Sequence, residues 1–295
     1  MVFVQQRHVV ARDGTRIGYQ VHGEGPCVVL ANGLGGTHVT WKYFYDALAV
    51  GYRTICWDYR GLFTSDAPAD PHAIGMADHV SDLIAILDHE GVTEVVIVGW
   101  SMGVQVAIET FRRHRGRVRG MFLVDGTYGR TFSTVLGSRL IGQTIPMLLR
   151  LVRAQAALVG RATQRLAGSQ ALIAAMKRVG LVSETIDLDV FRAVAASFVG
   201  VDWRIYSDML LRLDEHDAED VLATIDVPVA IAVGDRDLMT PPATAEHMHR
   251  TIRGSRLVVI AGGTHYTPVE YPAILVDELA RLLARVPGWD KRVAA

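Results

Sequence analysis

Residues 95–103 read Val-Val-Ile-Val-Gly-Trp-Ser-Met-Gly. The apolar run predicts a buried strand, and a helix is expected to follow over 104–113. Between them stands a Gly-x-Ser-x-Gly pentapeptide, so that Ser101 falls on the turn from strand to helix. Such a turn lifts a serine hydroxyl out of the backbone, close to a base and a helix N-terminus, while the flanking glycines prevent clashes. The stretch therefore predicts a nucleophilic serine in an α/β fold.

Short apolar strands alternate with amphipathic helices along most of the chain. A hairpin joined by the tight-turn dipeptide Asp13-Gly14 is expected first. The predicted strands cover 8–11, 16–22, 26–31, 52–57, 94–98, 118–124, 227–233 and 256–261, and helical patterns cover 40–48, 76–90, 104–113, 145–159, 169–179 and 274–285. This order is typical of an α/β fold with a mostly parallel, twisted sheet flanked by helices.

The strand rhythm stops for a long stretch in the middle of the chain. Residues 131–213 contain helical apolar patterns and no strand-like run. We therefore predict an α/β core made of residues 1–130 and 214–295, with a helical cap, or lid, inserted at 131–213. The apolar residues of the cap either form the interior of a small bundle or also line a substrate pocket over Ser101.

A nucleophilic serine requires a histidine base, and the histidine requires a carboxylate that fixes its tautomer. The chain supplies Gly-Asp-Arg-Asp, which ends at Asp237, after one strand, and Gly-Gly-Thr-His, which ends at His265, after the next. Because both follow strands of a parallel sheet, they share with Ser101 the edge at which such sheets bind ligands. His265 is the predicted base. The acid is Asp237 or, alternatively, Asp125, which ends the strand after the nucleophile helix.

With these motifs the chain resembles the α/β-hydrolase fold superfamily, and within it an esterase- or lipase-like member with a helical cap. The resemblance covers about residues 8–285. Ser101 matches the nucleophile of the family and His265 the base. Asp237 stands at the usual position of the acid, although some members place the acid where Asp125 stands. The resemblance implies a catalytic triad of Ser101, Asp237 and His265.

Two loops add to the resemblance. Residues 58–61, Asp-Tyr-Arg-Gly, match the family's Asp-x-Arg-Gly loop and are expected to brace neighbouring loops. Residues 32–36, Asn-Gly-Leu-Gly-Gly, resemble the oxyanion loop, with Asn32 where many relatives have histidine. The expected oxyanion donors are the backbone N–H groups of Leu34 and Met102, and the expected pocket and loop residues are Asn32, Gly33 and Trp100.

Composition limits the possible partners. The net charge of −1 argues against binding to nucleic acid or another polyanion. No uncharged apolar run approaches the roughly 20 residues of a membrane span. Cys27 and Cys56 fall in predicted strands, which favours reduced core thiols over a disulfide or a metal pair. Residues 1–7 lack the features of a secretory signal, so a cytoplasmic location is expected.

The nucleophile limits the reactions that the chain is expected to catalyse. Dehalogenases and epoxide hydrolases of this fold need a carboxylate nucleophile, whereas Ser101 suits acyl transfer to water. We predict hydrolysis of a carboxylic ester, lactone or thioester of a mostly hydrophobic small molecule, with no metal or cofactor. The alternatives are C–C bond hydrolysis, perhydrolysis or acyl transfer on the same fold and, more remotely, a non-catalytic ligand-binding protein. The sequence leaves the oligomeric state open.

Overall fold

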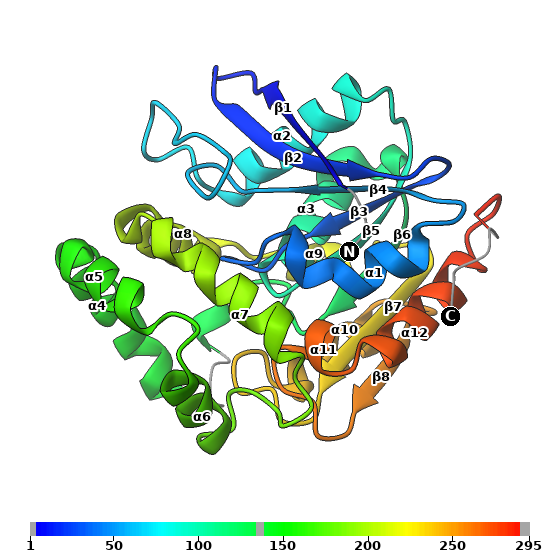
Figure 1. Cartoon of the computed structure of the whole chain (residues 1–295). Helices are drawn as coiled ribbons and strands as arrows, with labels where there is room; N and C mark the ends of the chain where they lie inside the picture. The colour runs from blue at the N-terminus through cyan, green and yellow to red at the C-terminus, as the bar shows by residue number, and fades with distance from the viewer. Residues whose placement is uncertain (1–3, 134–138, 290–295) are drawn as a thin grey trace.

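A computed structural model describes residues 4–133 and 139–289 of the chain. An eight-stranded sheet forms its centre, in the order β1-β2-β4-β3-β5-β6-β7-β8 (Figure 1). Strand β2 is antiparallel to both of its neighbours, and the remaining pairs are parallel. The strands are β1 (Gln5–Val10), β2 (Arg16–His22), β3 (Cys27–Ala31), β4 (Arg53–Trp57), β5 (Val95–Trp100), β6 (Val118–Val124), β7 (Val229–Gly234) and β8 (Arg256–Ile260).

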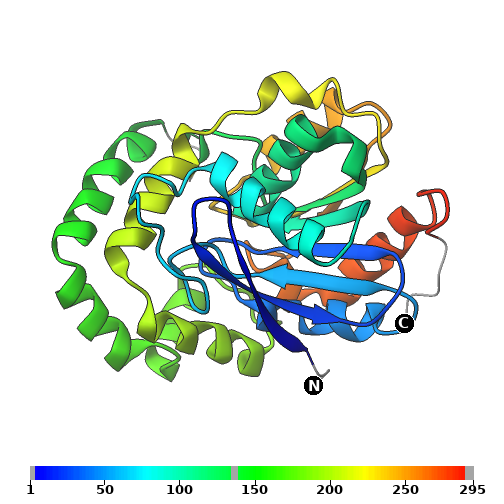
Figure 2. The same ribbon diagram turned by 90° about the horizontal axis from the view of Figure 1, so that it is seen from above.

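Helices cover both faces of the sheet (Figure 2). One face packs against α2 (Met76–His89), α3 (Met102–His114) and α10 (Pro242–Thr251), and the other against α1 (Lys42–Leu48) and α12 (Pro272–Leu283). Two short helices, α9 (Glu219–Leu222) and α11 (Thr267–Glu270), complete the core. The predicted α/β fold with a mostly parallel sheet is thereby confirmed.

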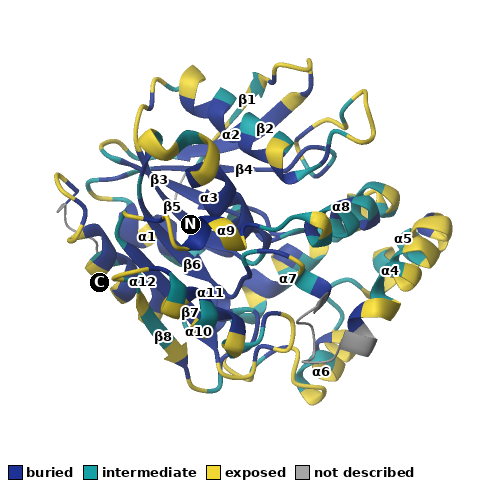
Figure 3. Cartoon of the chain, turned by 180° about the vertical axis from the view of Figure 1, so that it is seen from behind, coloured by how far each residue is buried: buried dark blue, intermediate teal, exposed yellow. Residues whose placement is uncertain are grey.

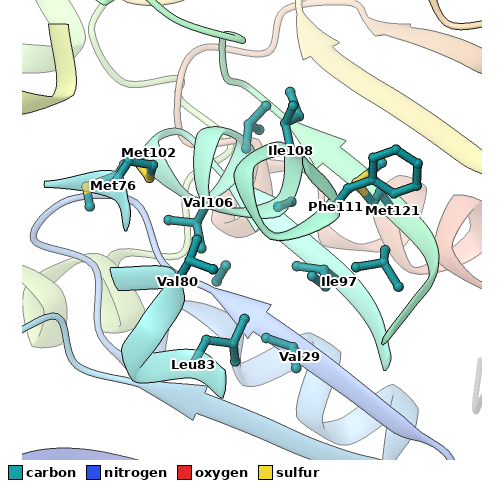
Figure 4. Packing of buried hydrophobic residues seen from close by; sticks show 14 of the residues in the cluster. Val29, Met76, Val80, Leu83, Ile97, Met102, Val106, Ile108, Phe111 and Met121 are labelled. Atoms are coloured by element: carbon teal, nitrogen blue, oxygen red, sulfur yellow. The ribbon is translucent and has the colours of Figure 1, made fainter. Parts of the chain in front are cut away.

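The strand β5 shows why the central strands are apolar throughout. Its side chains alternate between the two faces, so that Ile97 packs toward α2 and α3 while Val96 and Val98 pack toward α1 and α12. All three side chains are fully buried. In Figure 4, Ile97 lies among Val29, Leu83 and other apolar side chains. A parallel sheet covered on both faces requires this continuous apolar run, because neither face meets water.

In the described residues between β6 and β7, five helices precede the short helix α9. They are α4 (Arg139–Ala154), α5 (Ala156–Leu166), α6 (Gln170–Arg178), α7 (Leu188–Ser197) and α8 (Trp203–Glu215). The helical pattern over 145–159 is divided between α4 and α5 at Gln155. No glycine or proline stands at this break. The break lets α4 and α5 each contact α8. Residues 1–3, 134–138 and 290–295, which belong to the predicted core and cap ranges, lie outside the described residues.

The Asp-x-Arg-Gly loop braces its surroundings as expected. Arg60 is buried, and its guanidinium donates to Asp82 and to Asp13, each at 2.8 Å. Asp58 accepts the backbone N–H of Thr64 at 3.3 Å. Of the two carboxylates, Asp82 is buried and Asp13 is exposed. Arginine paired with carboxylates satisfies its donors in fixed geometry, so the loop is held beside the sheet.

Both cysteines agree with their prediction. Cys27 and Cys56 are buried and free, without a disulfide. Burial raises the pKa of the Cys27 thiol to about 12, which keeps it protonated and unreactive.

Candidate active site

The serine of the pentapeptide stands at a strained turn. Ser101 separates the last residue of β5 from the first residue of α3, and its φ of 56° and ψ of −117° are rare for any residue with a side chain. Its N–H donates to the carbonyl of Val124 at 3.0 Å, which ties the turn to β6. The surrounding sheet and helix thus hold a conformation that the residue alone would avoid.

Glycines surround this turn because the backbone segments approach one another closely. A Cβ at Gly99 would collide with the carbonyl of Gly103, and a Cβ at Gly103 with the carbonyl of Ala31. The loop after β3 also passes close by, since a Cβ at Gly33 would lie 3.1 Å from the Cβ of Ser101. The close approach brings the glycine-rich loop directly against the serine.

The predicted histidine contacts this serine, and one of the predicted aspartates contacts the histidine. His265 Nε2 lies 2.9 Å from Ser101 Oγ, and His265 Nδ1 lies 2.8 Å from Asp237 Oδ2. His265 and Asp237 are 5% and 3% exposed. The three side chains come from loops that follow β5, β7 and β8, and they form one continuous chain of hydrogen bonds. A proton can therefore pass between Ser101 and an imidazole whose other nitrogen is fixed by a carboxylate.

Hydrogen bonds also fix the carboxylate of Asp237. Its Oδ1 accepts the N–H groups of Met239 and Thr240 at 2.8 and 2.9 Å, and its Oδ2 accepts the hydroxyl of Thr240 at 2.7 Å. Sequence reasoning overlooked Thr240. Its signal was available, since a threonine soon after an aspartate at a turn is well placed to satisfy that carboxylate.

The alternative acid, Asp125, is fully buried at the end of β6. Its Oδ1 accepts the N–H of Gly234 at 3.0 Å, and its Oδ2 accepts the N–H of Thr267 at 3.2 Å and the hydroxyl of the same residue. These bonds connect the end of β6 to the last residue of β7 and to the first residue of α11. The imidazole of His265 is hydrogen-bonded to Asp237 instead.

The electrostatics of the site follow from burial and from these carboxylates. Burial lowers the pKa of His265, but the charge and hydrogen bond of Asp237, followed by the charges of Asp125 and Glu270, raise it above its ordinary 6.5. Burial and the charge of Asp237 raise the pKa of Asp125 to about 8. The neutral imidazole of His265 is therefore a stronger base than a free histidine side chain.

Glu270 is a further buried carboxylate that the sequence did not indicate. It accepts the N–H and the hydroxyl of Thr264 at 2.8 and 2.7 Å, next to His265. It also accepts the N–H of Ser183 at 2.7 Å, on the segment between α6 and α7. Glu270 therefore connects the histidine loop to the helices inserted after β6.

The two backbone N–H groups expected as oxyanion donors belong to Met102 and Leu34. Met102 begins α3, so its N–H has no acceptor within the helix. Leu34 lies on the glycine-rich loop that approaches Ser101, and the loop continues with Gly35 at a φ of 84°. Phe198 fills the space that a side chain at Gly35 would need.

The structure separates the roles of the remaining predicted residues. Asn32 is fully buried; its amide donates to the carbonyl of Trp57 at 2.9 Å and accepts from the Trp41 indole at 2.7 Å. It anchors the base of the loop and is absent from the described lining of the cavity. Gly33 and Trp100 do line the cavity. The Trp100 indole also donates to the carbonyl of His265 at 2.8 Å.

A cavity of about 890 Å³ opens over Ser101. Nineteen of its 31 described lining residues come from α4 to α8 and the turns between them, and none of the 31 is aspartate, glutamate, lysine or arginine. Ile173, Phe191 and Val194 are examples of buried apolar side chains in this wall. A pocket with this lining excludes charged ligands and favours extended apolar ones.

A protein-family model described as alpha/beta hydrolase fold matches residues 26–272. The chain belongs to the α/β-hydrolase fold family. The match spans β3 to β8, the serine turn, Asp237 and His265.

Individual relatives of this α/β-hydrolase are distant. An uncharacterized protein of Mycobacterium tuberculosis is 29% identical over 282 residues, which cover 92% of this chain and 79% of the relative. A pimeloyl-[acyl-carrier protein] methyl ester esterase of Neisseria meningitidis is 29% identical over 173 residues, which cover 59% of this chain and 63% of the relative. Among solved structures, the esterase RhEst1 of Rhodococcus sp. ECU1013 has a TM-score of 0.74 at 26% identity, covering 95% of this chain and 99% of the other.

Within residues 4–133 and 139–289, no cluster of three or more histidine, cysteine, aspartate or glutamate side chains is arranged to hold a metal ion. Over the same ranges, no helix has the length and apolar character needed to cross a membrane.

Proposed function

We propose that this α/β-hydrolase cleaves an ester-type bond of a mostly hydrophobic small molecule through an acyl-enzyme on Ser101. The observation that carries the proposal is the hydrogen-bonded chain from Ser101 Oγ through His265 to Asp237, with distances of 2.9 and 2.8 Å. A serine in this arrangement is activated by the base at the moment of attack. The same mechanism applies to a carboxylic ester, a lactone or a thioester.

The mechanism follows from the order of these contacts. Ser101 Oγ attacks the carbonyl carbon while its proton passes to His265 Nε2. Asp237 stabilises the resulting imidazolium and keeps the Nδ1 proton in place. The backbone N–H groups of Leu34 and Met102 would then bind the oxyanion of the tetrahedral intermediate.

The second half of the reaction releases the product. His265 returns its proton to the leaving alcohol or thiol as the C–O or C–S bond breaks, which leaves the acyl group on Ser101. Water then attacks the acyl-enzyme, giving a proton to His265, and a second tetrahedral intermediate collapses to the free acid. Ser101 recovers its proton from His265, so that the enzyme is unchanged.

The cavity supports a hydrophobic acyl or alcohol group. We propose that residues 131–213 act as a cap that determines which substrate fits over Ser101, and that residues 1–130 and 214–295 supply the core. Most of the described lining belongs to the cap helices and is apolar. The esterase names of the Neisseria and Rhodococcus relatives agree with an ester substrate.

A panel of p-nitrophenyl esters tests the proposal. Wild-type protein should hydrolyse at least one member, and the Ser101→Ala variant should not. Complete inactivity of the wild type would favour the non-catalytic binding protein. Hydrolysis of a C–C diketone substrate at a higher kcat/KM than any ester would favour the alternative chemistry on the same site.

A further inference from the structure

Basic residues are concentrated in one part of the cap, although the net charge of the whole chain is close to zero. Residues 131–183 contain seven basic residues and no acidic one, whereas the rest of the chain has 23 basic and 31 acidic residues. The seven are Arg139, Arg150, Arg153, Arg161, Arg165, Lys177 and Arg178. Residues 131–183, about two thirds of the cap, are therefore strongly cationic on an otherwise acidic protein.

Large apolar side chains are exposed on the same helices. Nine of the fifteen large hydrophobic side chains found exposed in the described residues lie between Met147 and Val199. On α4, Met147, Leu148 and Leu151 are 69%, 58% and 58% exposed. Their spacing places them beside one another on the helix surface. Figures 1 and 2 show α4 and α5 on the outer side of the molecule, away from the sheet.

Exposed cations lie among these apolar side chains. Arg150 lies next to the exposed apolar side chains of α4 in the sequence. Arg161 and Arg165 follow Leu158 at helical spacing on α5. All three arginines are exposed, and none takes part in an ion pair among the described residues. Figure 3 shows little buried surface along α4 and α5.

Two other basic residues of the cap are already paired. Arg153 donates to Asp208 at 2.7 Å, and Lys177 lies 2.9 Å from Glu184. The available positive charge is therefore concentrated on the exposed arginines of α4, α5 and α6, where Arg178 also carries no ion pair within the described ranges.

The exposed apolar surface continues into the cavity. Leu158, Leu166 and Leu172 are 56%, 51% and 40% exposed, and all three also line the cavity over Ser101. These side chains therefore form a rim between the outer face of the cap and the interior. An apolar molecule that enters between them meets a cavity wall whose described residues include no aspartate, glutamate, lysine or arginine.

We propose that the outer face of α4, α5 and α6 docks on an anionic lipid surface. Exposed apolar side chains enter the boundary between headgroups and acyl chains, and neighbouring arginines attract anionic headgroups. A second copy of this chain is a poorer partner, because a twofold contact through this face would oppose one set of unpaired arginines to the same set.

Docking would place the rim of the cavity against the lipid phase. The substrate would then be an acyl ester that partitions into lipid and enters between Leu158, Leu166 and Leu172. This consequence rests on the proposed function, because it assumes hydrolysis at Ser101. The binding of lipid itself does not depend on catalysis.

Co-sedimentation with vesicles tests the docking. The full chain carrying Ser101→Ala is mixed with vesicles of phosphatidylcholine alone or of phosphatidylcholine with phosphatidylglycerol. We expect binding to the mixed vesicles, weakened by salt, and little to the neutral ones. Adding Arg161→Gln and Arg165→Gln should weaken binding about 25-fold, since each arginine near an anionic surface contributes about a factor of five.

A matched pair of substitutions provides the control. Arg12 and Arg253 are also exposed and without an ion pair among the described residues, and they lie outside the cap, on the β1–β2 turn and on the segment before β8. Arg12→Gln with Arg253→Gln should leave binding unchanged, and both double variants should keep the thermal unfolding midpoint of the parent. Leu148→Ser with Leu151→Ser should weaken binding without changing hydrolysis of a soluble ester by otherwise wild-type protein.

Three results would overturn the docking. These are equal binding to neutral and anionic vesicles, equal losses in the two arginine pairs, and a dimer in light scattering that Arg161→Gln and Arg165→Gln dissociate. Failure of the proposed function has a different signature: vesicle binding would persist while wild-type protein hydrolyses neither soluble nor vesicle-borne esters.

Discussion

The carboxylate of Asp125 accepts the backbone N–H of Gly234 at 3.0 Å. This bond links the end of β6 to the start of the loop that carries Asp237. Together with the bonds to Thr267, it makes Asp125 a buried connector of the loops around His265. Asp125 is thus hydrogen-bonded to these loops, whereas Asp237 is hydrogen-bonded to the imidazole, and we expect a positioning role for Asp125.

Substituting the two aspartates separately distinguishes these roles. Asp237→Asn should lower kcat on the order of 10⁴-fold, because an amide cannot hold the required tautomer of His265. Asp125→Asn should lower kcat far less but destabilise the protein by about 1–3 kcal/mol, since the amide N–H₂ cannot accept from the donors it meets. Steady-state kinetics and thermal unfolding measure both. The reverse pattern would mean that Asp125 is the acid.

Ser101 should be the residue that carries the acyl group. Treatment with an organophosphonate should yield one adduct in intact-protein mass spectrometry, and peptide mapping should place it on Ser101. Ser101→Ala should lower kcat on the order of 10⁶-fold, as the loss of a triad serine does. An adduct on another residue, with Ser101→Ala still active, would exclude this mechanism.

The pH dependence of hydrolysis should reflect the raised pKa of His265. Only the neutral imidazole can accept the serine proton, so kcat/KM should fall as the pH falls through this pKa, which lies above 6.5. Burial would lower that pKa, and the charge of Asp237 opposes it. Asp237→Asn should consequently move the acid limb to lower pH. An acid limb centred well below 6.5 in the wild type would contradict the assignment.

The turn itself is open to a steric test. A methyl group at Gly99 would collide with the carbonyl of Gly103, so Gly99→Ala should destabilise the protein by about 1–3 kcal/mol, as other overpacked sites do, and impair labelling of Ser101. Gly116 offers the control, because a Cβ there meets nothing within 4 Å. Gly116→Ala should change stability by about 0.5 kcal/mol or less. Equal unfolding midpoints for the two variants would show that the turn tolerates a side chain.

The fold was predictable because its strongest signals are local. Buried parallel strands contain apolar runs, such as Met-Phe-Leu-Val at 121–124 in β6, and the bounds of 118–124 were predicted without error. The approach of Ser101 and His265 follows from topology, since both come after strands of one parallel sheet. Sequence separation does not matter once the strand order places β5, β6, β7 and β8 side by side.

Other features depend on packing that no local pattern records. The sequence offered two aspartates at equivalent strand ends, and only the hydrogen bonds around Asp125 and Asp237 distinguish them. Asn32 was expected near the pocket, but its side chain turns toward Trp41 and Trp57 in the core. The contact of Glu270 with Ser183 joins parts of the chain whose proximity is set by the whole fold.

The cavity should determine which chain length is accepted. We expect kcat/KM for p-nitrophenyl esters to rise about fourfold per methylene until the cavity is full, since each buried methylene contributes about 0.8 kcal/mol. Ala195 on α7 lines the cavity, so Ala195→Phe should shorten the preferred acyl chain. Ala196 is exposed and not part of the described lining, and Ala196→Phe should leave the profile unchanged. A flat profile, or the same shift in both variants, would show that the cap does not select the substrate.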